Sequence, residues 1–318
     1  MVGRKLFVAT IVGTLSILLT ACTPSEEQTS QVTAETMAPI RDQIIILGDI
    51  SDDPSEVIDG SQPLADYLAS NLRDYGITEG QVKIAATMDE MTQLLKNREV
   101  DLYFDSVYPA TIISDASGAL PILRRWRFGV EEYYTVIFAS EESGITSIED
   151  LLGHMIAMDA PYSTSGYLLP AAHLVEGSIN LVGKHSYNDS VADNEVGFVF
   201  SYDDENTVQW VLRGLTAAGA TDDYHYYVAF PEETTDKLVV LAKTDSIPRQ
   251  IVIVRSGVNP KLLEAITRIL TTAHETEEGQ IALEAFQTSR FDEFPEGIET
   301  AAEQMRQMIE IVQGLSLP

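Results

Sequence analysis

The stretch that decides the fold is an apolar run, Ile44-Ile45-Ile46-Leu47-Gly48. Four consecutive apolar residues before a glycine are typical of a buried strand that ends in a turn. Leucines with helical spacing follow at Leu64, Leu68 and Leu72, which predicts a helix over residues 63–75. Further strands are predicted at 82–86 and 100–104, with a helix at 88–97 between them. This alternation favours a parallel sheet covered by helices.

A second alternation of strands and helices lies between residues 148 and 222. Its predicted strands are 155–158, 195–200 and a piece ending at 222, and its predicted helices are 148–152, 167–176 and 207–217. Extended segments near 133–140 and 238–255 join the two sets, and helices are predicted at 260–273, 278–287 and 298–313. We therefore expect an α/β fold of two lobes, each a sheet flanked by helices, joined by two hinge crossings. Ligands prefer the cleft of such a fold.

The N-terminus has the pattern of a secretory signal over residues 1–21. Arg4 and Lys5 precede an apolar core, and the core ends in Leu19-Thr20-Ala21-Cys22. This end resembles a bacterial lipobox, in which the cysteine receives lipid. Cys22 is the one cysteine of the sequence, so we expect lipidation there. An uncleaved anchor or a plainly secreted protein are the alternatives.

The domain boundaries expected from these patterns follow the chain in order. They are 1–21 for the signal peptide, 22–43 for a flexible tether, 44–135 for the first part of lobe 1, 136–246 for lobe 2, and 247–318 for the hinge return and C-terminal helices. The tether is polar and lacks aromatic residues, which favours a flexible spacer.

The charge balance is strongly acidic and excludes some partners. The 318 residues carry 20 Lys+Arg against 49 Asp+Glu, a formal net charge of −29. Removing Arg4 and Lys5 with the signal leaves 18 basic residues and a net charge of −31. Such a surface repels nucleic acid and anionic lipid, so membrane attachment should depend on the lipid alone. An acid- or salt-adapted surface would give the same composition.

The sharpest local motif follows the predicted strand at 155–158 and opens a helix. It contains Ser163, Thr164, Ser165 and Gly166. The first N–H groups of a helix lack internal partners and lie at the positive end of its dipole. Hydroxyls there add donors, and a glycine would let a ligand approach, so the segment predicts an anion site built without a positive side chain. A plain Ser/Thr helix cap is the alternative.

Several stretches together resemble the phosphate/phosphite/phosphonate-binding family of ABC-transporter substrate-binding proteins, which have the type II periplasmic-binding-protein fold. The resemblance covers roughly residues 44–295. The matching stretches are Gln62-Pro63-Leu64-Ala65-Asp66-Tyr67-Leu68, Val100-Asp101-Leu102-Tyr103-Phe104, residues 143–153, Ser163-Thr164-Ser165-Gly166-Tyr167-Leu168-Leu169-Pro170, Ala218-Gly219-Ala220-Thr221-Asp222 and Ile247-Pro248.

The resemblance implies an extracytoplasmic, lipid-anchored protein that delivers a small anionic or zwitterionic solute to an ABC permease. It implies no cofactor, no metal, no catalysis and a monomer. In the family the Ser-Thr-Ser segment grips the oxyanion, which points to Ser163, Thr164 and Ser165, and the aspartate corresponding to Asp222 lies at the cleft. A sensory lipoprotein that presents its bound state to a membrane receptor is the alternative. An enzyme is disfavoured because nucleophile elbows, paired-histidine motifs and phosphate loops are missing from the sequence.

Further residues that could contact a ligand are suggested by the expected fold and by positions where this sequence differs from the family. Ser51, Ser106 and Tyr108 lie in loops that should face the cleft, with ordinary turn residues as the alternative. The acids at 203–205 could disfavour a free oxyanion and suit a ligand bearing an ammonium group. They could instead form the acidic first turn of a solvated helix. His173 and His225 could each reach the cleft, with a packing role as the more common one for a lone histidine. We expect Tyr133 to serve at the hinge and in core packing.

Overall fold

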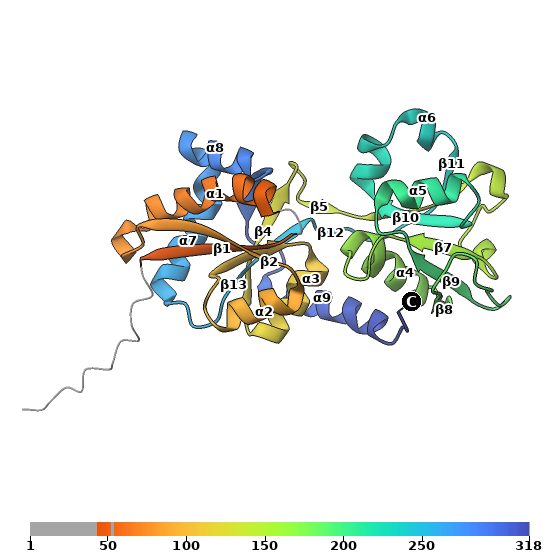
Figure 1. Ribbon diagram of the computed structural model, residues 1–318, viewed down its shortest axis with the longest axis horizontal. Coiled ribbons are helices and arrows are strands. Elements are labelled where there is room, and N and C mark those ends of the chain that lie inside the picture. Colours follow the sequence, from red (N-terminus) through yellow and green to blue (C-terminus); the bar gives the residue numbers. More distant parts are fainter. Residues whose placement is uncertain (1–42, 52–53, 318) are drawn as a thin grey trace, which may run out of the picture. The chain divides into compact units, whose positions relative to one another are not determined.

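The protein is seen in a computed structural model that describes residues 43–51 and 54–317. Within those residues the strands form two six-stranded sheets and one two-stranded pair (Figure 1). The first sheet with its helices is called lobe 1 and has the strand order β14-β4-β13-β3-β1-β2. The second is called lobe 2 and has the order β11-β6-β10-β7-β9-β8. The predicted two-lobed α/β fold is confirmed.

The elements have the following bounds. The strands of lobe 1 are β1 (Ile44–Ile50), β2 (Glu79–Ala85), β3 (Leu102–Asp105), β4 (Leu120–Arg127), β13 (Gln250–Val254) and β14 (Thr288–Asp292). The strands of lobe 2 are β6 (Thr135–Ser140), β7 (Met155–Met158), β8 (Leu181–Gly183), β9 (Val196–Phe200), β10 (Ala218–Asp222) and β11 (Leu238–Lys243). The α-helices are α1 (Pro54–Asn71), α2 (Met88–Lys96), α3 (Val107–Ser117), α4 (Leu169–Glu176), α5 (Asp204–Leu212), α6 (Glu232–Thr235), α7 (Pro260–Thr272), α8 (Glu277–Ala285) and α9 (Ile298–Gln313). Single π-helical turns are η4 (Thr164–Leu168) and η5 (His225–Ala229), and short 3-10 turns are η1 (Arg73–Tyr75), η2 (Glu141–Ser143), η3 (Glu149–Leu151) and η6 (Ala273–Glu275).

Helix α1 begins nine residues before the predicted start, with Pro63 in its interior. An interior proline costs about 3 kcal/mol of helix stability. The three predicted leucines are fully buried, and burying each contributes about 1.5–3 kcal/mol. Packing therefore outweighs the proline. The helix also lies close against β2, because a Cβ on Gly80 would lie 2.2 Å from the backbone of Ala65.

The sequence patterns did not predict α3, β4 and β14 of lobe 1. Helix α3 is buried on nearly every side, so it lacks the polar face that gives a helical period. Strand β4 reads Leu-Pro-Ile-Leu-Arg-Arg-Trp-Arg, and its arginines obscure the apolar pattern of a strand. Arg124 and Arg125 are nonetheless buried, with 4% and 5% of their surface exposed.

In lobe 2 the strands that matter for the site are parallel neighbours. Strand β7 pairs in parallel with both β9 and β10, so their carboxyl ends meet at one edge of the sheet. Strand β7 has its predicted bounds. The predicted helix at 167–176 starts earlier as the π-turn η4 and continues as α4. The predicted helix at 207–217 is α5, which starts at residue 204 and is followed by β10.

The crossings between the lobes are shorter than the predicted segments. The two-stranded pair consists of β5 (Glu132–Tyr133) and β12 (Ile247–Pro248), which run antiparallel. The neighbouring runs β6 and β11 belong to the lobe 2 sheet, and β13 belongs to the lobe 1 sheet. The boundaries at 135/136 and 246/247 stay a prediction.

Helix α9 packs against both lobes. Ala301 and Met305 lie in an apolar cluster with α3 of lobe 1. Ile309 and Val312 lie in a cluster with α4 of lobe 2. The C-terminal helix, whose bounds are those predicted, therefore joins the two cores.

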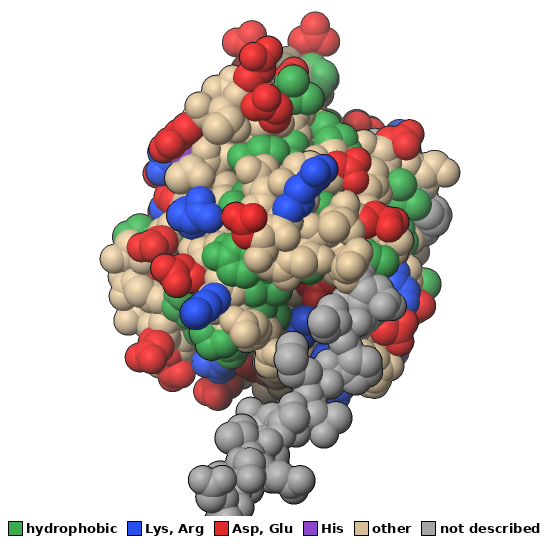
Figure 2. Space-filling model, turned by 90° about the vertical axis from the view of Figure 1, so that its left-hand side faces the viewer, with side chains coloured by type: hydrophobic (Ala, Val, Ile, Leu, Met, Phe, Trp, Pro, Cys, Tyr) green, Lys and Arg blue, Asp and Glu red, His purple; other side chains and the backbone are tan. Residues whose placement is uncertain are grey.

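The predicted signal peptide and Cys22 lie outside the described residues, as does the tether apart from Gln43. Within the part of the chain that is described, no helix combines the length and hydropathy needed to cross a bilayer. Acidic side chains are interspersed with Lys and Arg on the face drawn in Figure 2.

Candidate functional site

A cavity of about 300 Å³ lies between the two lobes and is called the interlobe cavity. Its walls come from the ends of β3, β4, β5 and β10, from the loop after β7, and from the residues around β12. The lining residues are Asp105, Ser106, Arg127, Tyr133, Asp159, Ala160, Pro161, Tyr162, Ser163, Thr164, Ser165, Asp222, Arg249 and Gln250. Five of the seven ligand-binding residues proposed from sequence are among them: Ser106, Ser163, Thr164, Ser165 and Asp222.

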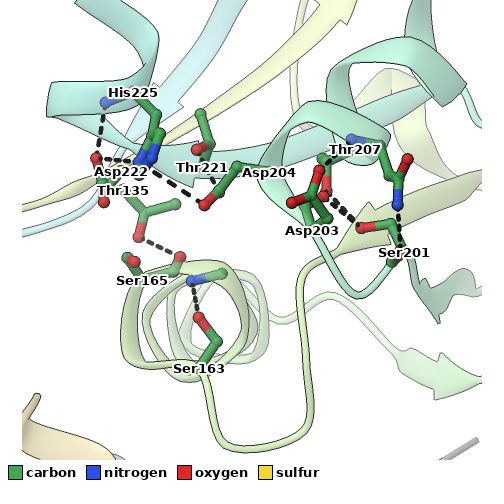
Figure 3. Close-up of polar contacts among 12 residues, drawn as sticks. Thr135, Ser163, Ser165, Ser201, Asp203, Asp204, Thr207, Thr221, Asp222 and His225 are labelled. Atoms are coloured by element: carbon green, nitrogen blue, oxygen red, sulfur yellow. Dashed lines mark hydrogen bonds and ion pairs between the residues drawn. The ribbon is translucent and has the colours of Figure 1, made fainter. Parts of the chain in front are cut away.

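The loop after β7 turns into η4 through a serine cap (Figure 3). The Ser163 hydroxyl accepts a hydrogen bond from the N–H of Gly166 at 2.9 Å. Burial raises the pKa of Asp159, although a hydrogen bond with Ser163 opposes the shift. A Cβ on Gly166 would lie 2.3 Å from the Cβ of Asp159. The glycine thus allows η4 to pack on Asp159, whereas the sequence pattern favoured a role in ligand approach.

Thr164 and Ser165 connect the start of η4 to its surroundings. Thr164 Oγ1 accepts a hydrogen bond at 3.0 Å from the N–H of Tyr108, which lies in α3 of lobe 1. The carbonyl of Ser165 accepts one at 2.6 Å from the hydroxyl of Thr135, and Tyr133 bonds to both Thr164 and Ser165. These bonds hold the helix start rigidly at the cavity wall, where its first N–H groups lack intrahelical partners.

Asp222 lies at the end of β10 between a cation and a histidine. Its Oδ2 accepts a hydrogen bond from Arg249 at 3.1 Å, and its Oδ1 accepts one from the N–H of His225 at 2.8 Å. Burial raises its pKa, but the bonds from His225 and the charge of Arg249 outweigh burial and hold the pKa at about 2. Asp222 is therefore an ionised, paired carboxylate at the cavity wall.

The acids at 203–205 form the first turn of α5 and do not line the interlobe cavity. Asp203 caps the helix by accepting the N–H of Asn206 at 2.9 Å. Asp204 accepts the hydroxyl of Thr221 at 2.6 Å, and burial raises its pKa to about 6. Glu205 is exposed. The acidic helix turn, one of the two interpretations from sequence, is what the structure shows.

The lobe 1 side of the interlobe cavity begins at the end of β3. Asp105 accepts hydrogen bonds from the hydroxyl of Tyr103 and, at 2.6 Å, from the N–H of Ser106. Burial raises the pKa of Asp105. Tyr108 and Ser51 do not line this cavity. Tyr108 packs between Tyr162 and Tyr167 with ring centroids 6.2 and 6.3 Å away. Ser51 donates its N–H to the carbonyl of Ala85 at 3.2 Å.

The two cations that line the interlobe cavity, Arg127 and Arg249, were not predicted from the sequence. Tyr133 was not predicted to line the cavity either, although it lies in the hinge strand β5 as expected. The only sequence signal for Arg127 was the cluster of three arginines at 124–127. Nothing local distinguishes Arg249, because its partner Asp222 is 27 residues away in sequence.

Two α/β lobes joined by a paired crossing, with a polar cavity at the strand ends, define a type II periplasmic binding protein. A family model described as "ABC transporter, phosphonate, periplasmic substrate-binding protein" matches residues 50–295. The chain therefore belongs to this family, whose members are solute-binding transporter components that work outside the cytoplasm with a membrane permease.

Solved structures agree with this assignment. XAC2383 from Xanthomonas citri bound to chloride ion is 26% identical, with a TM-score of 0.77 over 85% of this chain and 98% of that chain. The same protein bound to ATP gives 25% identity and a TM-score of 0.76 over 85% of this chain and 97% of that chain. PhnD1 from Prochlorococcus marinus (MIT 9301) in complex with methylphosphonate is 15% identical, with a TM-score of 0.58 over 85% of this chain and 97% of that chain. This last similarity supports the fold alone.

Proposed function

We propose that the chain is the solute-binding lipoprotein of an ABC importer and that it binds a small phosphorus oxyanion, namely phosphate, phosphite or a phosphonate, in the interlobe cavity. The observation that carries the proposal is the combination of a serine-capped helix start with two guanidinium groups in one cavity. Helix N-termini and arginine side chains are the donors that bind phosphoryl oxygens best.

The carboxylates of the interlobe cavity narrow the choice of ligand. Asp105 and Asp159 lie on its walls and, among the described residues, have no ion-pair partner such as Arg249 is for Asp222. Ionised, they would repel a bare oxyanion at short range. An ammonium group on the ligand would turn that repulsion into attraction, so an aminoalkylphosphonate fits the site better than free phosphate.

Ligand binding is tested by calorimetry and thermal shift on the purified protein. The probes are phosphate, phosphite, methylphosphonate and 2-aminoethylphosphonate, with ATP added because XAC2383 is bound to ATP in its structure. A bound ligand at 100 times its Kd should stabilise the protein by about 2.7 kcal/mol. Saturable binding of a phosphorus oxyanion is expected, and the absence of heat and shift with all of them would contradict the proposal.

Attachment through Cys22 is part of the same proposal, as are a monomeric state and the absence of catalysis. Cys22→Ser should move the protein from the membrane fraction to the soluble fraction, because a lipid chain provides the only strong affinity of so acidic a protein for a bilayer. Fractionation and mass spectrometry measure the change. Continued membrane retention of the variant would contradict lipid anchoring at this residue.

A further inference from the structure

A second cavity, of about 470 Å³, opens into lobe 1 beside the interlobe cavity and is called the lobe 1 cavity. It lies at the ends of β1, β3 and β4 and reaches α1 and the end of α8. Three residues, Asp105, Arg127 and Gln250, line both cavities. The two cavities therefore meet at these residues. Cavities of roughly 300–1,000 Å³ are typical of sites for ligands much larger than methylphosphonate.

The polar side chains of the lobe 1 cavity offer mainly acceptors. Asp49, Ser61 and Gln287 line it together with Asp105. Burial and the neighbouring Asp105 raise the pKa of Asp49 to about 6. Arg125 also lines the cavity, but it is engaged: it donates to Thr288 and Gln250 at 2.7 Å each and to the carbonyl of Phe286. Carboxylate and amide oxygens of this kind suit hydroxyl or amino groups of a ligand.

Arg127 differs from the two other arginines of β4. Arg124 makes two hydrogen bonds to Asp292, at 3.0 and 2.6 Å, and Arg125 is engaged as described above. Arg127 has a buried Nε without a hydrogen-bond partner among the described residues. Its Nη2 lies 3.4 Å from Gln287 Oε1. Burial and the nearby Arg249 lower its pKa, and the charges of Asp105 and Asp49 oppose that shift without outweighing it.

A guanidinium that is partly removed from water and has no ion pair among the described residues is costly to fold. Arg127 lies where the two cavities meet, so an anionic group of a ligand would supply the missing partner. A ligand anchored there by its phosphoryl group could extend its remaining part into the lobe 1 cavity, where the acceptors lie.

We propose that Arg127 binds the ligand's phosphoryl oxygens and that the lobe 1 cavity receives an organic body bearing hydroxyl or amino groups. The ligand class is then a phosphate ester or phosphonate with a body of sugar or nucleoside size. This inference rests on the proposed function and adds the lobe 1 cavity to the binding site as a second compartment.

Replacing Arg127 by an uncharged residue distinguishes a role in ligand binding from a role in stabilising the fold. In Arg127→Met, the Kd for methylphosphonate should rise at least tenfold, while the thermal midpoint of the ligand-free protein stays equal or rises. Arg290→Met, on the neighbouring strand β14 and outside both cavities, is the matched control and should change neither. An unchanged Kd, or a lowered midpoint in the ligand-free variant, would overturn the role of Arg127. Should this variant not fold, Arg127→Gln removes the charge and keeps a polar side chain, and a Kd within twofold of native would likewise overturn the role of Arg127.

Filling the lobe 1 cavity tests the second compartment. Calorimetry compares methylphosphonate with ribose 5-phosphate and AMP on the native protein, on Ala285→Phe and on Ile281→Phe. Ala285 is exposed at the end of α8 and lines the cavity, whereas Ile281 is exposed on the same helix and lines none of the cavities described above. We expect at least one of the two esters to bind tenfold more tightly than methylphosphonate, and we expect only Ala285→Phe to abolish that advantage.

The outcomes separate the two proposals. If methylphosphonate binds as tightly as both esters, or if Ala285→Phe weakens all three probes equally, the second compartment is wrong and the proposed function stands. If none of the three probes binds and the smaller oxyanions also fail to bind, both the second compartment and the proposed function are wrong.

Discussion

The two walls of the interlobe cavity are built from different chemistry. The lobe 2 wall offers hydroxyls and the N–H groups of a helix start, and of its two carboxylates Asp222 is paired with Arg249 whereas Asp159 is hydrogen-bonded to Ser163. The lobe 1 wall offers two partly buried charged groups, Asp105 and Arg127, and neither forms an ion pair with another described residue. The lobe 2 wall thus provides a paired carboxylate and the N–H donors of a helix start, whereas the lobe 1 wall provides a guanidinium that an anionic ligand would pair. We therefore expect the helix start of lobe 2 and Arg127 of lobe 1 to bind the oxyanion together, and the lobe 1 cavity to select what is attached to it.

The largest effect on stability should come from Arg249→Met. The Arg249 and Asp222 side chains are 10% and 6% exposed, and removing one partner of a buried pair typically costs about 3–5 kcal/mol. Urea denaturation should therefore show a loss of about 3 kcal/mol. The double variant Arg249→Met with Asp222→Asn is the control and should recover much of that loss. A loss below about 1 kcal/mol in the single variant would mean that the lobe 2 wall does not depend on this pair.

Next in size is the effect of the serines on binding. Ser163→Ala with Ser165→Ala should weaken phosphonate binding at least tenfold, or about 1.4 kcal/mol, because the cap and the hydroxyl donors are lost together. Calorimetry gives the Kd, and circular dichroism checks the fold. Thr87→Ala removes a comparable cap, the one that accepts the N–H of Glu90 at 3.2 Å at the start of α2, and should leave the Kd unchanged. Unaltered affinity in the double variant would place oxyanion recognition outside this wall.

The smallest effect is a pH dependence at His225. Its Nδ1 lies 3.1 Å from Asp222 and 3.7 Å from Asp204, and the contact with Asp222 raises its pKa despite burial. A raised pKa contributes stability that is present below about pH 6.5, the unfolded value, and is lost as pH rises through the folded value. With a third of the side chain exposed, we expect less than about 1 kcal/mol.

Unfolding free energies measured from pH 5 to pH 8.5 would show this contribution. The difference between native protein and His225→Gln should shrink as pH rises, while His154→Gln, an exposed control in the same lobe, should lack the trend. If the difference in unfolding free energy between native protein and His225→Gln grew with pH, the charged form of His225 would not be the stabilising one.

Local chemistry explains which parts of the site could be predicted from sequence. The Ser163–Ser165 segment was found because a helix cap and its strand are contiguous, so their geometry follows from neighbouring residues. Asp222 was predicted through a family resemblance that places the corresponding aspartate at the cleft, and the structure has Asp222 on the wall of the interlobe cavity. Arg249 and Arg127 were not found, because what makes them part of the site is a partner, or the lack of one, from a distant segment.

The sequence by itself determined the two alternating βα sets, the strand β7 with its serine-capped helix, and the C-terminal helix α9, since hydrophobic period and capping are local properties. Only the tertiary structure decided that Pro63 lies inside α1, that the acids at 203–205 form a helix turn, and that two cavities meet at Arg127. The physical reason is that burial and ion pairing depend on which distant segments pack together. Arg124 and Arg125 of β4, for example, could be recognised as buried only once the distant residues that accept their hydrogen bonds were in place.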